Sequence, residues 1–200
     1  MFVKKALALS LICGLALAQA PSQSAAPMPG HQGMDMPGMP GMPGMPGMPG
    51  MIPDMDPALA EHHFLSGMVP HHASAVAMSQ WILERSQDPQ IRTWAEGIIK
   101  SQNQEIEQIN QMLKSRGGAL TEPAAMMKQM GDQMQADLEA ASDPEQAFVE
   151  LMIPHHAQAV VMSAHVLALG QDPEVTDLAR QIATAQVEEI YQFKQWLAQR

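Results

Sequence analysis

The chain of 200 residues contains a single cysteine, Cys13, and this cysteine lies in a segment that we expect to be removed. Two lysines precede an apolar run over residues 6–18, and the run ends in the small-residue sequence Ala18-Gln19-Ala20. This pattern is typical of a secretory signal peptide over residues 1–20, with cleavage after Ala20. The mature chain would then have no cysteine, which excludes disulfides and thiolate ligands. The apolar run is also too short for a stable membrane anchor, so we expect a periplasmic or extracellular protein.

Basic residues are scarce as well, since 11 Lys and Arg stand against 21 Asp and Glu, for a net charge of −10. Such a surface repels nucleic acid and attracts cations, so we expect no nucleic-acid partner. The chain has no Glu-x-x-His sequence, which argues against a ferritin-like di-iron site. It has one tyrosine, Tyr191, and no recognisable set of residues around a nucleophile, so we expect a protein that is not an enzyme.

What the chain has in excess is methionine, 19 residues in all. Residues 21–56 form a Met-, Pro- and Gly-rich segment with repeated Gly-Met-Pro triplets, which predicts a disordered tail with polyproline-II bias. Its histidine lies in the sequence His31-x-x-Met34-x-Met36. Thioethers carry no proton that a metal must displace, so these residues are candidate ligands for Cu(I) over a wide pH range. The alternative is compositional bias in a linker.

The remainder, residues 57–200, is predicted to be all-α. Four Asp-Pro pairs have the form of a helix N-cap followed by the first helical residue, and they predict helices over residues 57–86, 89–115, 144–169 and 173–199. Gly117-Gly118 and Gly170 are expected to end the second and third of these helices. Matching apolar stripes predict an antiparallel four-helix bundle of two helical hairpins. Repeat 1 covers about 57–118 and repeat 2 about 143–200, while the connector 119–142 is expected to be a loop plus a short helix.

An internal repeat is the most informative feature of the sequence. The run Met-x-Pro-His-His-Ala-x-Ala-Val-x-Met begins at Met68 and recurs 84 residues later, at Met152. Imidazole and thioether form a ligand set suited to Cu(I), and imidazole also accepts Cu(II) or Zn(II). Because Met and His recur together, the repeat favours two copies of a metal site over ordinary core residues. The candidate ligands are Met68, His71, His72, Met78, Met152, His155, His156 and Met162.

Other features of the repeat leave alternatives open. Pro70 and Pro154 predict either a kink inside a helix or the start of a helix at each proline. Glu105 and Glu189 recur in Gln-x-x-Glu-Ile sequences, and each could orient a histidine from a second shell, although a solvated face or an interhelical hydrogen bond explains them as well. The pair His62-His63 has no counterpart in repeat 2, and we interpret it as exposed surface rather than an accessory ligand pair.

The motif Phe-x3-Met-x2-His-His-x2-Ala-Val-x-Met, followed by Asp-Pro, Gln-x2-Glu-Ile and a terminal Trp-Leu, resembles the family catalogued as domain of unknown function 305. The resemblance covers about residues 60–200 in two copies. It implies an exported copper-binding protein with a ferritin-like helical bundle, in which the ligands would be the eight Met and His residues named above. Pro70 and Pro154 depart from many members of the family.

These observations support an exported protein that sequesters or hands on copper, most readily Cu(I), and that meets another exported copper carrier or an exporter. Two other functions stay open. Histidines beside carboxylates would also suit a bundle metalloenzyme of the oxidase or peroxidase kind. Methionines in the connector, at positions 126, 127, 130 and 134, would suit an adaptor or oligomerisation module, because flexible thioether side chains adapt to varied partners.

Overall fold

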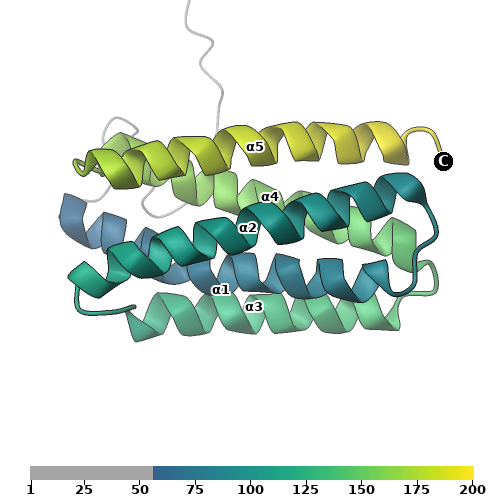
Figure 1. Cartoon of the computed structure of the whole chain (residues 1–200), viewed down its shortest axis with the longest axis horizontal. Helices are drawn as coiled ribbons and strands as arrows, with labels where there is room; N and C mark the ends of the chain where they lie inside the picture. Colours follow the sequence, from purple (N-terminus) through teal and green to yellow (C-terminus); the bar gives the residue numbers. More distant parts are fainter. Residues whose placement is uncertain (1–55) are drawn as a thin grey trace, which may run out of the picture. The chain divides into compact units, whose positions relative to one another are not determined.

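The computed structural model describes residues 56–200, and the predicted signal peptide and nearly all of the predicted tail lie outside the described residues. The described chain is all-α, and its helices lie side by side in a bundle (Figure 1). The helices are α1 (Pro57–Leu83), α2 (Pro89–Ser115), α3 (Thr121–Ala140), α4 (Pro144–Leu169) and α5 (Pro173–Leu197). None of them is long and apolar enough to cross a membrane.

The Asp-Pro pairs start helices α1, α2, α4 and α5, as predicted. The carboxylate of Asp88 accepts hydrogen bonds from the backbone N–H groups of Gln90 and Ile91, and the other three aspartates cap their helices in a similar way. Each cap satisfies an amide that has no partner within the helix, and proline needs no such partner. Gly117 and Gly118 follow α2 with φ angles of 86° and 98°, a conformation that suits glycine.

Helix α3 corrects two expectations, the one for the connector and the count of four helices, because the described chain has five. Residues 119–142 were expected to hold a loop plus a short helix, whereas α3 is a helix of 20 residues. Its buried positions are spaced four or seven residues apart, at Pro123, Met127, Gly131 and Leu138. The stripe is hard to detect in the sequence because only one of its members is aliphatic. Side-chain pairs four residues apart, such as Lys128 with Asp132, support the exposed face.

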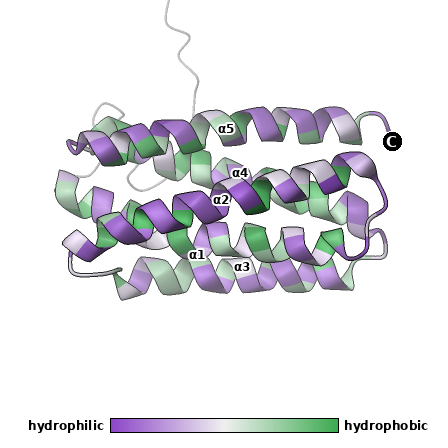
Figure 2. Cartoon of the chain, in the orientation of Figure 1, coloured by the Kyte–Doolittle hydropathy of each residue, from purple (hydrophilic) through white to green (hydrophobic). Residues whose placement is uncertain are grey.

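Helix α1 lies at the centre of the described chain, in contact with α2, α3 and α4, and α5 packs along α4. Hydrophilic residues, purple in Figure 2, lie on the outward faces of α2, α3 and α5. Helices α1 and α4 are the most apolar, because neighbours cover them on several sides. Both continue through their internal prolines, so the alternative in which helices start at Pro70 and Pro154 is wrong.

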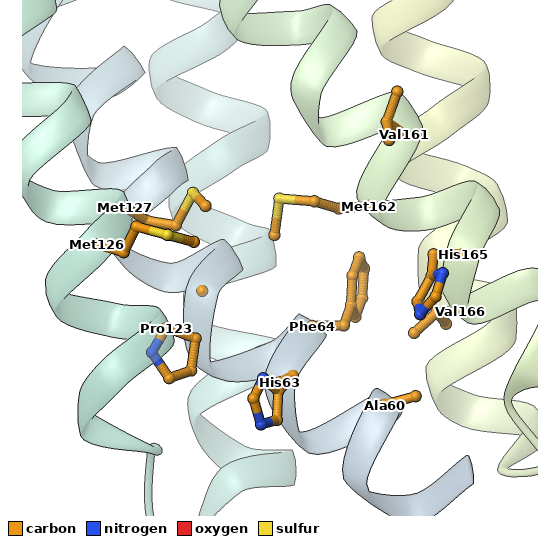
Figure 3. A pocket seen from close by; sticks show the side chains of 11 residues that line it. Ala60, His63, Phe64, Pro123, Met126, Met127, Val161, Met162, His165 and Val166 are labelled. Carbon is orange, nitrogen blue, oxygen red and sulfur yellow. The ribbon is translucent and has the colours of Figure 1, made fainter. Parts of the chain in front are cut away.

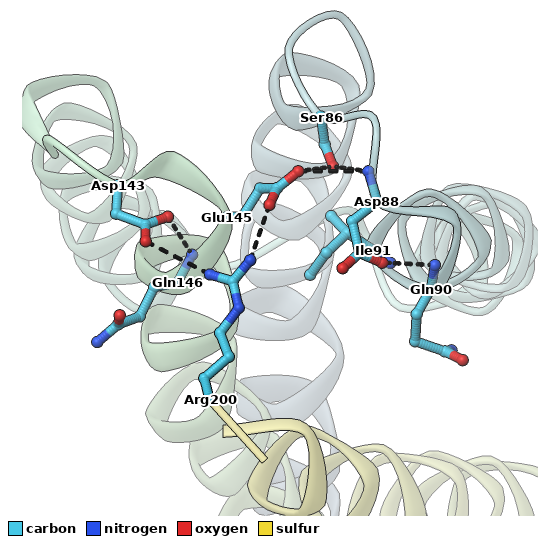
Figure 4. Close-up of polar contacts among 8 residues, drawn as sticks. All are labelled: Ser86, Asp88, Gln90, Ile91, Asp143, Glu145, Gln146 and Arg200. Carbon is cyan, nitrogen blue, oxygen red and sulfur yellow. Dashed lines mark hydrogen bonds and ion pairs between the residues drawn. The ribbon is translucent and has the colours of Figure 1, made fainter. Parts of the chain in front are cut away.

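Two buried or half-buried carboxylates connect the repeats at the ends of the bundle. Glu61 accepts hydrogen bonds of 2.6 and 2.7 Å from the backbone amides of Gln171 and Asp172, just before α5. Its repeat equivalent, Glu145, accepts hydrogen bonds from Ser86 Oγ at 2.6 Å and from the Asp88 amide at 3.3 Å, just before α2 (Figure 4). Each carboxylate therefore holds the turn of the other repeat, so the two hairpins stabilise each other.

Candidate metal centre

Four imidazoles meet in the middle of the bundle, where α1 and α4 cross. His71 and His155 stack with their ring centroids 3.8 Å apart, and each of them also lies beside the next histidine in its own helix, His72 or His156, with centroids 5.9 Å apart. All four residues are at most 3% exposed. We call this group the four-histidine cluster. It joins the two His-His pairs that the sequence shows 84 residues apart.

Reciprocal hydrogen bonds fix the two central rings. His71 Nε2 donates to the carbonyl oxygen of His155 at 3.1 Å, and His155 Nε2 donates to the carbonyl oxygen of His71 at the same distance. A carbonyl can only accept, so each Nε2 carries the proton and each Nδ1 carries a lone pair. Ser74 Oγ lies 2.9 Å from His155 Nε2 and donates to the carbonyl oxygen of His71. Ser74 could not be identified from the repeat, because glutamine occupies the equivalent position of repeat 2.

The outer two rings each face a carboxylate from a neighbouring helix. Glu105 Oε2 of α2 lies 2.7 Å from His72 Nε2, and Glu189 Oε2 of α5 lies 2.8 Å from His156 Nε2. Both nitrogens are outside hydrogen-bond geometry, so the carboxylates lie off the direction of the ring N–H and the contacts are electrostatic. The structure thus places both recurring glutamates against histidines and gives them only partial exposure to solvent.

The Nδ1 atoms of all four histidines are buried and have no hydrogen-bond partner. Buried lone pairs are normally satisfied, so each such atom calls for an explanation, such as a bound ion or water. The buried hydroxyls of Ser79 and Ser163, which are equivalent in the repeat, also have no partner. They follow Met78 and Met162 directly, so their recurrence is visible in the sequence.

Burial keeps the two central imidazoles neutral. Burial, and after it the neighbouring His72 and His156, lower the pKa of His71 from 6.5 to about 3, although the hydrogen bond with the His155 backbone opposes the shift. The pKa of His155 is well below its ordinary value, first through burial and then through His71 and the other two histidines. At neutral pH both rings therefore offer an unprotonated nitrogen, which is the form that binds a metal.

The thioethers lie at both ends of the cluster, and each group combines both repeats. Met68 belongs to a core cluster against which Met162 packs, while Met78 and Met152 lie together in a second core cluster. The sequence shows one set in each repeat, from Met68 to Met78 and from Met152 to Met162, and leaves open whether the two sets form separate sites or merge. Because α1 and α4 run in opposite directions (Figure 1), the start of one motif lies near the end of the other.

Thioethers matter for the chemistry of this region. In residues 56–200 no three His, Cys, Asp or Glu side chains are arranged to hold one ion. A metal centre in this region would therefore use methionine sulfur as a ligand or require the imidazoles to rotate.

The candidate residues His31, Met34 and Met36 lie outside the described residues. The pair His62-His63 is half-buried rather than exposed, and His62 Nε2 donates to the carbonyl oxygen of Gly118 at 2.6 Å.

Several solved structures are similar to this chain. CopM in its Cu(I)-bound form is 28% identical with a TM-score of 0.60, and the match covers 70% of this chain and 96% of that one. CopM in its Cu(II)-bound form is 30% identical with a TM-score of 0.59, over 68% of this chain and 94% of that one. A DUF305 fragment from Deinococcus radiodurans is 34% identical with a TM-score of 0.61, over 70% of this chain and 97% of the fragment.

Sequence comparison agrees with the structural likeness. The uncharacterized protein L153 of Acanthamoeba polyphaga mimivirus is 45% identical over 56 residues, which are 28% of this chain and 37% of that protein. The chain thus spans little more than a third of the viral protein. Residues 15–113 and 61–197 each match the family described as domain of unknown function (DUF305). Since these matches cover most of the sequence, the chain belongs to the DUF305 family.

Proposed function

We propose that this protein binds copper, preferentially Cu(I), and sequesters it or hands it on in copper homeostasis or resistance. The observation that carries the proposal is the set of four buried Nδ1 atoms without partners in the four-histidine cluster. A buried lone pair is costly unless something binds to it. Neutral imidazoles beside buried thioethers are a set of soft ligands, and Cu(I) is the ion that suits this set best. Cu(II) or Zn(II) would use the imidazoles alone.

The proposed ligands are the eight Met and His residues of the repeated motif, with Glu105 and Glu189 as second-shell groups that act on His72 and His156. A carboxylate close to one ring nitrogen makes the other nitrogen a better donor, and it would fix the orientation of the ring once the ring N–H turns toward it. The CopM structures support the choice of ion, because that protein is described in forms with Cu(I), Cu(II) and silver.

We propose binding without turnover. His72 and His156 are fully buried and the central pair is nearly so. Such shielding suits an ion that must be kept from water and oxidants, whereas an oxidase or peroxidase needs space for a substrate beside its metal. Turnover of peroxide or of Cu(I) by the loaded protein would contradict this part of the proposal.

The N-terminal residues complete the proposed function. A cleaved signal peptide, residues 1–20, would export the chain to the periplasm or the outside of the cell, and the Met-rich segment 21–56 would collect copper for the bundle. His31, Met34 and Met36 are its proposed ligands. N-terminal sequencing of the mature protein tests the export step, and a start at Pro21 is expected.

The central test is an anaerobic Cu(I) titration against a chromophoric chelator, with the mature chain and with a chain that begins at Asp54. Tight binding by the shorter chain would support a site in the bundle. The variant with His71, His72, His155 and His156 changed to alanine should lose that affinity while its circular dichroism stays helical. A second variant, Met68→Leu with Met152→Leu, preserves core volume and separates loss of ligands from loss of fold. Unchanged copper stoichiometry in both variants, with residues 21–53 removed, would refute the proposal.

A further inference from the structure

A cleft of 310 Å³ opens between α1, α3 and α4, outside the four-histidine cluster (Figure 3). Met126 and Met127 reach into it from α3, and Met162 faces them from α4. Two imidazoles also line it, His63 of α1 in the lower part of Figure 3 and His165 of α4 at its right. The cleft therefore gathers three thioethers and two imidazoles from three helices.

The rest of the lining leaves little choice of ligand. It consists of alanine, phenylalanine, glycine, proline and valine, and it contains no carboxylate, hydroxyl, lysine or arginine. Hard cations such as Mg²⁺ and Ca²⁺ require oxygen ligands, so they do not suit the cleft. Anions have no cationic partner in it. A soft d¹⁰ cation suits thioether and imidazole, and no positive side chain in the lining repels it.

The repeat departs from its own pattern at three residues that line the cleft. His63 and His165 stand where repeat 2 has Ala147 and repeat 1 has Trp81, and Gly67 stands where repeat 2 has Leu151. A Cβ added at Gly67 would come within 3.3 Å of Met162 Cε and 3.4 Å of Met127 Cγ. The glycine therefore provides the space in which these two thioether side chains meet.

Core filling explains Met126 less well than ligand binding does, whereas Met127 is buried. Met126 is 53% exposed, so its side chain is largely in water rather than packed in the interior. Met normally fills irregular gaps in a core, and an exposed Met beside an open cleft gains little from that role. Met162 has a further neighbour, because it packs against the core cluster that contains Met68. The cleft thus lies next to a thioether group of the proposed inner centre.

We propose that this cleft is a second soft-metal site, in which Met126, Met127 and Met162 bind Cu(I) or Ag(I) together with His63 or His165. An ion bound at this surface site would pass from it to the inner ligands. The choice of ion rests on the proposed function, and Met162 is a proposed ligand of both sites. The other four proposed ligands of the cleft have no part in the four-histidine cluster, so either site can exist without the other.

The test is NMR of the full-length protein with ¹³C-labelled methionine methyl groups, titrated with Ag(I), and with signals assigned by single Met→Leu changes. The signals of Met126, Met127 and Met162 should shift together. In the variant His63→Ala with His165→Ala, that shift should require at least about 10-fold more free Ag(I), because loss of a ligand costs no less than loss of a group that only supports one. Gly67→Leu, which places the residue of repeat 2 in the cleft, should abolish the shift.

Met130→Leu is the matched control, since Met130 lies on the same helix and is 43% exposed but does not line the cleft. It should change neither the shift nor the Ag(I) concentration at which the shift occurs. Signals of Met126 and Met127 that stay still while those of Met68 or Met152 move would overturn this inference and leave the inner centre intact. The reverse result would contradict the inner centre alone, so the two failures are distinguishable.

Discussion

Mild acid should destabilise the metal-free protein, because His71 and His155 stay neutral in the folded state. Burial, and after it the neighbouring histidines, lower the pKa of His71 from 6.5 to about 3 and put that of His155 well below 6.5. In the unfolded chain both rings gain a proton as the pH falls through about 6.5. Below that pH the unfolded state therefore binds more protons than the folded state, and the free energy of unfolding falls with falling pH. The stability that these rings contribute is present above pH 6.5.

The size of the effect follows from the number of protons. One group that is neutral when folded and has an unfolded pKa of about 6.5 lowers the free energy of unfolding by about 1 kcal/mol between pH 6.5 and 5.5. Two such groups give about 2 kcal/mol over this interval, and the slope approaches about 2.7 kcal/mol per pH unit at lower pH. Carboxylates contribute mainly below this window, so the interval isolates the histidines.

Urea unfolding with a chelator present, followed by circular dichroism at each pH, measures this slope. The variant His71→Gln with His155→Gln has no ring to protonate and should lose about 2 kcal/mol of the change between pH 6.5 and 5.5. The matched control, Ser79→Ala with Ser163→Ala, also alters two buried polar side chains of α1 and α4 but should keep the slope. A wild-type stability that stays constant over this interval would refute the reasoning, as would a slope that persists in the glutamine variant.

Three further changes test other parts of the structure. Gly131→Ala should lower the free energy of unfolding, measured in a urea titration, by about 1–3 kcal/mol, because the new Cβ would lie 2.4 Å from Ser74 Cβ. Equal or greater stability of this variant would show that α3 does not pack closely on α1. Glu61→Ala leaves two part-buried amides without their acceptor and should cost about 1–3 kcal/mol, measured by thermal unfolding. The loss should be smaller for Glu145→Ala, because that carboxylate is more exposed than Glu61. Glu105→Gln should weaken Cu(I) binding about tenfold in chelator competition, whereas Glu107→Gln on the same helix should not, and equal affinities would contradict the role of Glu105.

Glu145 gives a further pH dependence at one end of the bundle. Its hydrogen bond with Ser86 lowers the pKa of the carboxyl below 4.5, and the Asp88 amide and Arg200 act in the same direction. A carboxylate with a lowered pKa stabilises the fold above its unfolded pKa, and this contribution is lost as the pH falls through the folded value. The interaction lies in the contact group of Figure 4, so its loss loosens the turn that precedes α2.

The first residues of α1, α2, α4 and α5 were predictable from the sequence because capping is local, whereas α1 and α5 end at Leu83 and Leu197, before the predicted residues 86 and 199. An aspartate carboxylate and amides two or three residues away form the cap, and proline fixes the first turn, so neither depends on the rest of the fold. The pairing of Met with His-His was equally visible as a repeat. Helix α3 was not, because its buried face contains proline, glycine and methionine in place of an aliphatic stripe.

Tertiary packing alone decided which side chains meet. The sequence identifies His71 and His155 as equivalent residues, but only the crossing of α1 and α4 puts their rings 3.8 Å apart and buries both. The same crossing brings Met68 near Met162 rather than near Met78, and it lets α3 form the cleft at Met126 and Met127. Periodicity defines the face of each helix, whereas contacts between residues 84 positions apart depend on the direction and register in which whole helices pack, which no local pattern encodes.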